Sequence, residues 1–131
     1  MPSRQTLQIS AFCSLYVAWA IALLIPVPTE EAAEVLGGAD EAFLFGKMVH
    51  VSAYGVLTLL GGFMRMPRKR RWLVLGLVSF HGFATEFFQQ FVNRHASLRD
   101  VGLDHVGISL GILIGWHWWR ALFRQKATEP V

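Results

Sequence analysis

The residues of this chain that could carry chemistry are three ionisable side chains placed inside apolar runs. Glu86 and Asp104 are carboxylic acids within a stretch from 81 to 111, and His50 precedes them in an earlier apolar run. A carboxyl group held partly out of water and an imidazole can both exchange protons near neutral pH. Glu86, His50 and Asp104 are therefore the candidate acid and base residues.

A second set of polar residues lies close to these three in the sequence and suits an anionic ligand. Arg binds phosphate or carboxylate through two parallel hydrogen bonds, and Lys binds the same groups as a point charge. The candidate ligand-binding residues are Lys47, Tyr54, Gln89, Arg94, Ser97 and Asp100.

A divalent cation is an alternative ligand for the same region, because imidazole and carboxylates suit such ions. His50, Glu86, Asp100 and Asp104 are the residues that could bind it. No close metal-binding spacing such as H-E-x-x-H occurs, so the sequence predicts no metal site and names no cofactor.

The composition is that of an integral membrane protein. Of 131 residues, 53% are hydrophobic and only 16% are charged, and the mean hydropathy is +0.41. A single cysteine, Cys13, excludes an internal disulfide. The net charge of +3 does not indicate nucleic-acid binding, because the basic residues flank apolar runs and form no stripe with interleaved aromatics.

The apolar runs predict one all-α domain over 1–131 with four transmembrane helices, each near the length of about 20 residues that a bilayer requires. Ala18-Trp19-Ala20 resembles a signal-peptide cleavage site, but the apolar run continues to Ile25, which favours an uncleaved helix. Thr29 could cap a short surface helix in the acidic connector. The predicted transmembrane helices cover about 7–27, 42–64, 72–92 and 101–123.

Short connections require the four helices to alternate in direction, which puts both termini and the basic turn at 65–71 on one side. That side carries nine of the twelve Lys and Arg residues. Because positive residues concentrate in cytoplasmic loops, both termini are predicted to lie in the cytoplasm. The expected location is the inner (plasma) membrane of a bacterial cell.

Counting along the helices predicts that three ionisable residues reach one depth. His50 is 15 residues from Arg65, Glu86 is 15 from Arg71, and Asp104 is 16 from Arg120. At about 1.5 Å per residue each lies roughly 22–24 Å from the cytoplasmic boundary, in a hydrocarbon core about 30 Å thick. The polar residues should therefore form one cluster near the outer surface, with Lys47, His50 and Tyr54 on one helix face.

Three motifs in this order resemble the VanZ-like family of small bacterial membrane proteins. They are K-x-x-H-x-x-x-Y (Lys47, His50, Tyr54), G-x-x-x-E-x-x-Q (Gly82, Glu86, Gln89) and R-x-x-S-x-x-D (Arg94, Ser97, Asp100), and a helix with Gly107 and Gly111 follows them. The resemblance covers residues 47–111. It implies a four-helix inner-membrane protein, from a family whose founding member is linked to teicoplanin, that is glycopeptide, resistance. One departure is Asp104, where the family pattern commonly has Asn.

Two hypotheses about function follow from the cluster. In the first, it recognises or modifies an anionic lipid-linked or peptidoglycan-related ligand at the outer face and contributes to glycopeptide tolerance, with membrane lipids as neighbours. In the second, the protein is a non-enzymatic membrane scaffold or accessory protein whose polar side chains only hold the helices together. Amides in place of Glu86 and Asp104 would satisfy the second role but not the first. The sequence leaves open whether a reaction is catalysed and whether the protein forms oligomers.

Overall fold

The protein is entirely α-helical in the part that the computed structural model describes, residues 3–25, 29–92 and 98–123. This confirms the predicted all-α class. The elements are α1 (Arg4–Leu24), α2 (Thr29–Leu36), α3 (Ala39–Phe63), α4 (Arg68–Gln89), α5 (Leu98–Ile114), the short α6 (Trp116–Trp119) and a 3₁₀ turn, η1 (Arg120–Leu122).

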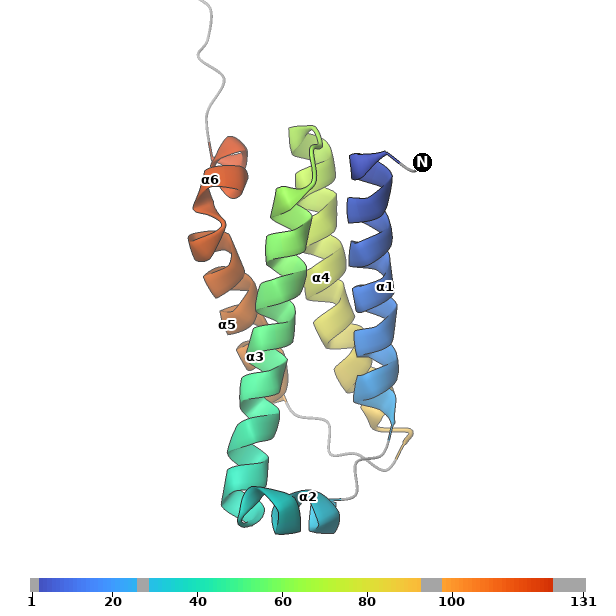
Figure 1. Ribbon diagram of the computed structural model, residues 1–131, viewed down its shortest axis with the longest axis vertical. Coiled ribbons are helices and arrows are strands. Elements are labelled where there is room, and N and C mark those ends of the chain that lie inside the picture. Colours follow the sequence, from blue (N-terminus) through green and yellow to red (C-terminus); the bar gives the residue numbers. More distant parts are fainter. Residues whose placement is uncertain (1–2, 26–28, 93–97, 124–131) are drawn as a thin grey trace, which may run out of the picture.

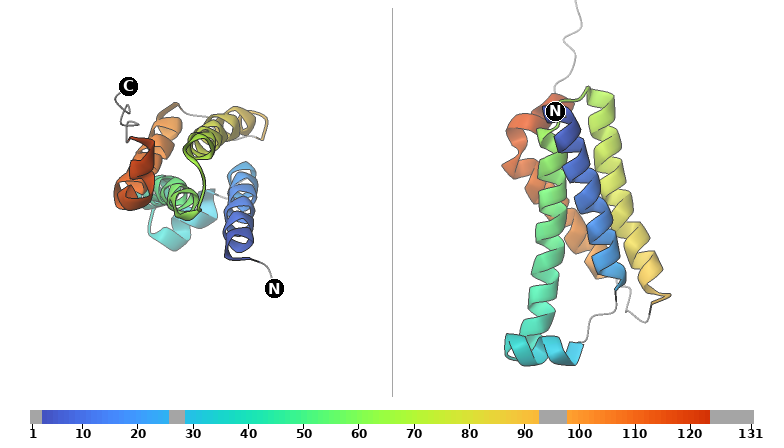
Figure 2. Two further views of the ribbon diagram at one scale, coloured as in Figure 1. Left: turned by 90° about the horizontal axis from the view of Figure 1, so that it is seen from above. Right: turned by 45° about the vertical axis from the view of Figure 1, so that its right-hand side comes forward.

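The long helices form an antiparallel bundle in which α3 packs against α1, α4 and α5 (Figure 1). Seen from above, α1 and α5 lie on opposite sides of α3 (Figure 2). The start of α1, the turn between α3 and α4, and α6 share one end of the bundle, which we call the basic end because it carries Arg4, Arg65, Arg68, Lys69, Arg70, Arg71 and Arg120. At the opposite end, which we call the acidic end because it carries Glu34, Asp40 and Glu41, α2 lies across the bundle and contacts α3.

Local sequence signals explain where α1 and α3 begin. Ser3 caps α1, its hydroxyl accepting a hydrogen bond from the Thr6 backbone N–H at 3.1 Å. Gly37 and Gly38 separate α2 from α3 with φ angles of +96° and +155°, in the region that only glycine adopts without strain. Because this turn is so tight, α3 begins at Ala39, ahead of the predicted position 42.

The last predicted helix, 101–123, is not continuous. It begins earlier, at Leu98, and ends at Ile114, and the chain changes direction at Gly115 before α6. The Trp119 side chain, fully buried, packs directly on Gly62 of α3 and lies 5.7 Å from the Arg71 guanidinium. The predicted continuous helix is thus interrupted where the chain turns to bury Trp119. The apolar pattern of 101–123 does not reveal this tertiary contact.

The α3–α5 contact is close because two glycines of α5 face the backbone of α3. A Cβ atom added to Gly107 would lie 2.3 Å from the Val51 carbonyl oxygen, and one added to Gly111 would lie 2.7 Å from that of Gly55. Small residues at such positions let two helix backbones approach. The glycine spacing on α5 is therefore used for packing.

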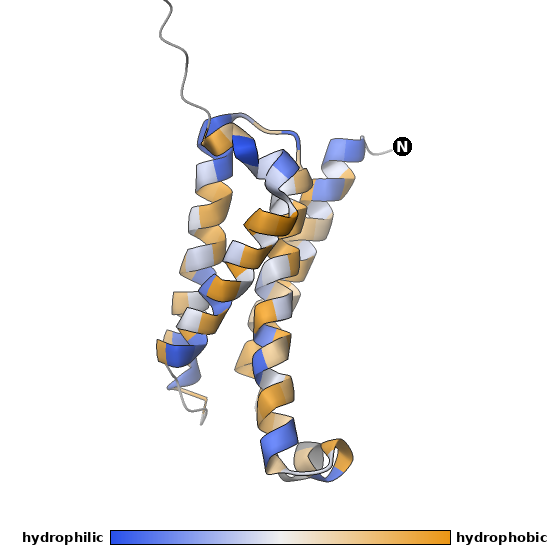
Figure 3. Ribbon diagram, turned by 90° about the vertical axis from the view of Figure 1, so that its left-hand side faces the viewer, coloured by the Kyte–Doolittle hydropathy of each residue, from blue (hydrophilic) through white to orange (hydrophobic). Residues whose placement is uncertain are grey.

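The outer faces of the bundle are apolar. Phe80, Phe91, Leu113 and Ile114 are 66–72% exposed. Hydrophobic residues dominate the middle of the helices and hydrophilic residues gather towards both ends (Figure 3). Among the described residues α1 and α3 are long and apolar enough to cross a membrane, judged by length and composition alone.

Candidate functional site

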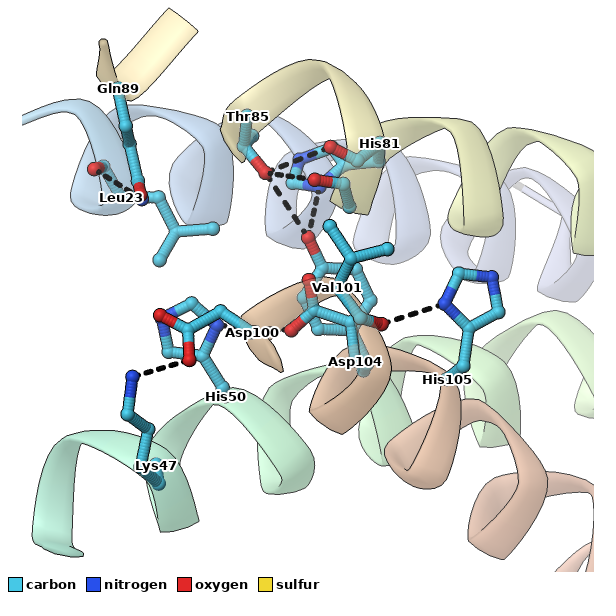
Figure 4. Close-up of polar contacts among 12 residues, drawn as sticks. Leu23, Lys47, His50, His81, Thr85, Gln89, Asp100, Val101, Asp104 and His105 are labelled. Carbon is cyan, nitrogen blue, oxygen red and sulfur yellow. Dashed lines mark hydrogen bonds and ion pairs between the residues drawn. The ribbon is translucent and has the colours of Figure 1, made fainter. Parts of the chain in front are cut away.

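Two pairs of charged or titratable side chains join α3 to α5 near the acidic end (Figure 4). Lys47 forms an ion pair with Asp100, and His50 Nδ1 lies 2.9 Å from Asp104 Oδ1. The two residues of α3 are three apart and the two of α5 are four apart, so each pair occupies successive turns of facing helices. The structure thus brings together four of the residues that the sequence marked as candidates.

Asp104 is the most deeply buried acid in the described part of the chain. Its exposed fraction is 0%, compared with 4% for Glu86 and 7% for Asp100. Its Oδ1 atom accepts the hydrogen bond from His50, whereas Oδ2 has no hydrogen-bond partner among the described residues. The unfilled hydrogen-bonding capacity of a buried carboxylate is costly, which marks Asp104 as a residue that packing alone does not explain.

Gly82 of α4 makes room for the Asp104 carboxylate. A Cβ atom added to Gly82 would lie 2.9 Å from Oδ2 and 3.4 Å from the Asp104 Cβ atom. This contact gives a physical reason for the glycine that begins the G-x-x-x-E-x-x-Q motif. Gly82 therefore belongs to the site although it contributes no functional group.

The His50–Asp104 contact fixes the chemistry that His50 can perform. An ionised carboxylate oxygen can only accept, so with Asp104 ionised Nδ1 carries the hydrogen and Nε2 is the basic nitrogen of the neutral ring. The indole of Trp19 in α1 approaches the imidazole edge to face, with 5.9 Å between ring centroids. A histidine oriented by a buried carboxylate in this way can act as a general base or acid.

Tyr54 and His81 form a second polar group, one turn nearer the basic end. His81 Nε2 lies 3.1 Å from the backbone carbonyl of Tyr16, which can only accept, so Nε2 carries the hydrogen. Nδ1 then accepts the hydrogen bond that the Tyr54 hydroxyl donates at 2.8 Å. Tyr54 is 0% and His81 3% exposed, so this chain of hydrogen bonds across α1, α3 and α4 lies in the core.

Two further side chains of α4 continue the network towards the acidic end. Thr85 Oγ1 donates to the His81 carbonyl at 2.8 Å and lies 3.4 Å from the Tyr54 hydroxyl. Gln89 is buried and donates to the Leu23 carbonyl of α1 at 3.1 Å. Gln89, predicted as a ligand-binding residue, thus links two helices in this structure.

The structure also shows which carboxylate binds His50. The residue count places both Glu86 and Asp104 at the depth of His50, and the observed contact is with Asp104. Glu86 is buried on the same face of α4 as Gly82 and Gln89. Arg94 and Ser97, the other two predicted ligand-binding residues, lie outside the described residues.

Sequence reasoning missed His81, Thr85 and Tyr16 as members of the network. The spacing of four between His81 and Thr85 places them on one face of α4, which was a usable signal. Tyr16 gives no such signal, because it stands alone in an apolar run and contributes its backbone carbonyl to His81. His105 is a third case, since its ring joins the Val101 carbonyl and the Ser79 hydroxyl at 2.7 Å each.

The described residues do not form a metal centre. No three His, Cys, Asp or Glu side chains in that part of the chain come close enough together to hold a metal ion.

The chain matches no protein-family model, no curated protein and no solved structure.

Proposed function

We propose that the protein is a VanZ-like integral membrane protein of the bacterial inner membrane, with α1, α3, α4 and α5 as its four spans and both termini in the cytoplasm. In the most apolar 18-residue stretch of each helix, only 11% of the residues of α1 and 22% of those of α3 are buried within the bundle. The core helix of a soluble protein is mostly buried. Their outward apolar faces need a partner, and lipid acyl chains are the partner that covers them all round. The basic end, with seven of the Lys and Arg residues, would face the cytoplasm.

Cysteine labelling tests this orientation. In a Cys13→Ser background, Leu98→Cys at the acidic end should react with a membrane-impermeant maleimide added to intact cells, because Leu98 is 86% exposed. Lys69→Cys at the basic end should react only after the membrane is opened. Reversed labelling would show that the polar network faces the cytoplasm, and labelling of both sites in a soluble extract would overturn the membrane location.

We further propose that the polar network recognises or modifies an anionic lipid-linked or peptidoglycan-related ligand near the outer surface, and contributes to glycopeptide tolerance. The observation that carries this proposal is the His50–Asp104 pair, in which a wholly buried carboxylate orients a histidine and keeps one oxygen without a hydrogen bond inside the described bundle. His50 is the proposed acid or base. Glu86, buried one turn along α4 from Gly82, is the second ionisable group of the proposed site.

Lys47 supplies the charge that would attract such a ligand. Its side chain is 25% exposed and the side chain of its partner Asp100 is 9% exposed, so the pair lies at the edge of the network nearest the acidic end. A phosphate or carboxylate of the ligand could take the place of Asp100 on the Lys47 ammonium group. A ligand bound to Lys47 in this way would lie next to His50, which is one turn deeper on the same face of α3.

Replacing the two buried acids by amides tests the function without changing side-chain shape. We expect Asp104→Asn and Glu86→Gln to fold normally but to lose roughly tenfold or more in binding of a polyprenyl-phosphate-linked cell-wall precursor, measured by native mass spectrometry. Cells expressing either variant at matched levels should also lose the teicoplanin tolerance given by the unchanged protein. Full binding and full tolerance in both variants would refute an ionisable role for the two acids.

The scaffold role is the second candidate, and a specific observation favours it. Lys47–Asp100, His50–Asp104 and Tyr54–His81 each join side chains of two different helices. If the amide variants keep every activity and stay folded, these contacts serve assembly alone, and the protein is a membrane accessory without a ligand site.

A further inference from the structure

A groove at the basic end combines positive charge with an apolar floor. Its volume is about 200 Å³, and it lies between the start of α1 and the turn that joins α3 to α4. Arg65, Arg70 and Gln5 supply the polar part of its lining. This groove is at the end of the bundle opposite the His50–Asp104 pair, so it is a separate feature of the molecule.

No acid among the described residues lies near the charge in the groove. The acidic side chains of the described residues lie in α2, at the start of α3, late in α4 and early in α5, all away from the basic end. Arg65 and Arg70 are both exposed, so their guanidinium groups are available to an anion. Two guanidinium groups beside one groove suit a phosphate, which each can bind through paired hydrogen bonds.

The floor and walls show what kind of phosphate compound fits. Phe12, Met64 and Val74 are buried beneath the groove, and Ile9 and Leu73 are 45% and 61% exposed at its sides. A free inorganic anion would leave these apolar walls in contact with water. A phospholipid would instead place its phosphate on the arginines and its acyl chains along the exposed apolar faces of α1 and α4.

We propose that this groove binds the headgroup of an anionic phospholipid of the cytoplasmic leaflet. The proposal rests on the membrane location argued above and is independent of any ligand at the polar network. Basic pockets at the cytoplasmic ends of transmembrane helices are suited to anionic lipid headgroups. Gln5 donates to the Arg65 carbonyl at 3.4 Å, which ties the start of α1 to the arginine turn and holds the two sides of the groove together.

The test uses the full chain purified in a neutral detergent, with dioctanoyl phosphatidylglycerol as the anionic probe. Dioctanoyl phosphatidylcholine and inorganic phosphate are the comparison probes. We expect phosphatidylglycerol to raise the thermal unfolding temperature of the unchanged protein, because a ligand that binds only the folded state stabilises it. The double variant Arg65→Gln/Arg70→Gln should bind this lipid about tenfold more weakly or worse, whereas Lys69→Gln/Arg120→Gln should bind it like the unchanged protein.

The control variant removes the same charge from the same end, at exposed residues that do not line the groove. Three results would overturn the proposal: equal stabilisation by phosphatidylcholine, an equal effect of inorganic phosphate alone, or equal loss of binding in both double variants. Native mass spectrometry of retained lipid gives a second readout that does not depend on the unfolding temperature. If the labelling experiment finds the protein in the soluble fraction, the membrane location is refuted. That outcome differs from the three above, which refute only specific binding of the lipid headgroup in the groove.

Discussion

Gly107→Ala should lower the free energy of unfolding by about 3 kcal/mol, near the upper end of the usual cost of overpacking. The new methyl group would lie 2.3 Å from the Val51 carbonyl oxygen and 3.1 Å from the Tyr54 Cβ atom. A backbone carbonyl inside a helix cannot rotate away, so α5 must move off α3. That movement would also lengthen the His50–Asp104 contact, because Asp104 lies one turn before Gly107 on α5. The measurement is unfolding of the detergent-solubilised protein by SDS, followed by circular dichroism.

Gly102→Ala is the matched control on the same helix. Nothing lies within 4 Å of a Cβ atom added at Gly102, so the methyl group meets open space. Alanine is also the better helix former by about 1 kcal/mol, which predicts unchanged or slightly higher stability. If both glycine variants unfold at the same SDS fraction as the unchanged protein, the close approach of α3 and α5 is not what holds the bundle.

Asp104→Ala should have the second large effect, a loss of roughly 1–3 kcal/mol of stability, because it leaves a buried donor without its acceptor. The substitution removes the acceptor from the buried His50 ring and leaves space beside Gly82. Asp104→Asn, which keeps an acceptor oxygen, should cost no more than about 1 kcal/mol. Ordinary hydrogen bonds between transmembrane helices contribute only about 0.6 kcal/mol each, so a larger alanine effect distinguishes the buried His50–Asp104 contact from simple helix attachment.

Asp100→Ala provides the comparison for Asp104→Ala. Asp100 lies one turn earlier on α5, and its partner Lys47 is partly exposed to its surroundings. A partly exposed ion pair contributes about 1 kcal/mol or less. A double-mutant cycle of His50 and Asp104 should show coupling that the corresponding cycle of Lys47 and Asp100 lacks. Equal coupling in both cycles would contradict a special role for the buried pair.

Much of this architecture could be predicted from the sequence because it follows from apolar run length and from helix periodicity. The spacing of Lys47, His50 and Tyr54 places them on one helix face, and the structure has all three directed into the bundle. Counting helix rise from the arginines put His50 and Asp104 at one depth, and the two residues are in contact. Depth is predictable since a helix has a fixed rise for each residue.

The pairings within that depth could not be predicted, because they depend on how each helix is rotated about its axis. Glu86 and Asp104 are predicted at the same depth as His50, so depth alone does not select a partner. The close approach of α3 and α5 at Gly107 brings Asp104, not Glu86, to His50. The break at Gly115 was missed for a related reason. Its cause is the burial of Trp119 against Gly62, a contact between residues 57 positions apart.

The attachment of α1 has a consequence for how the sequence can change. Both hydrogen bonds that described side chains of α4 donate to α1 end on backbone carbonyls, those of Tyr16 and Leu23. A carbonyl is present whatever side chain its residue carries, so these two contacts place no demand on the amino-acid type at either position. The side chains of α1 do carry other contacts: the Tyr16 hydroxyl donates to the Leu77 carbonyl of α4 at 3.1 Å, and the Trp19 indole meets the His50 ring. Substitution at Tyr16 or Trp19 would therefore cost α1 contacts that the two carbonyl bonds do not replace.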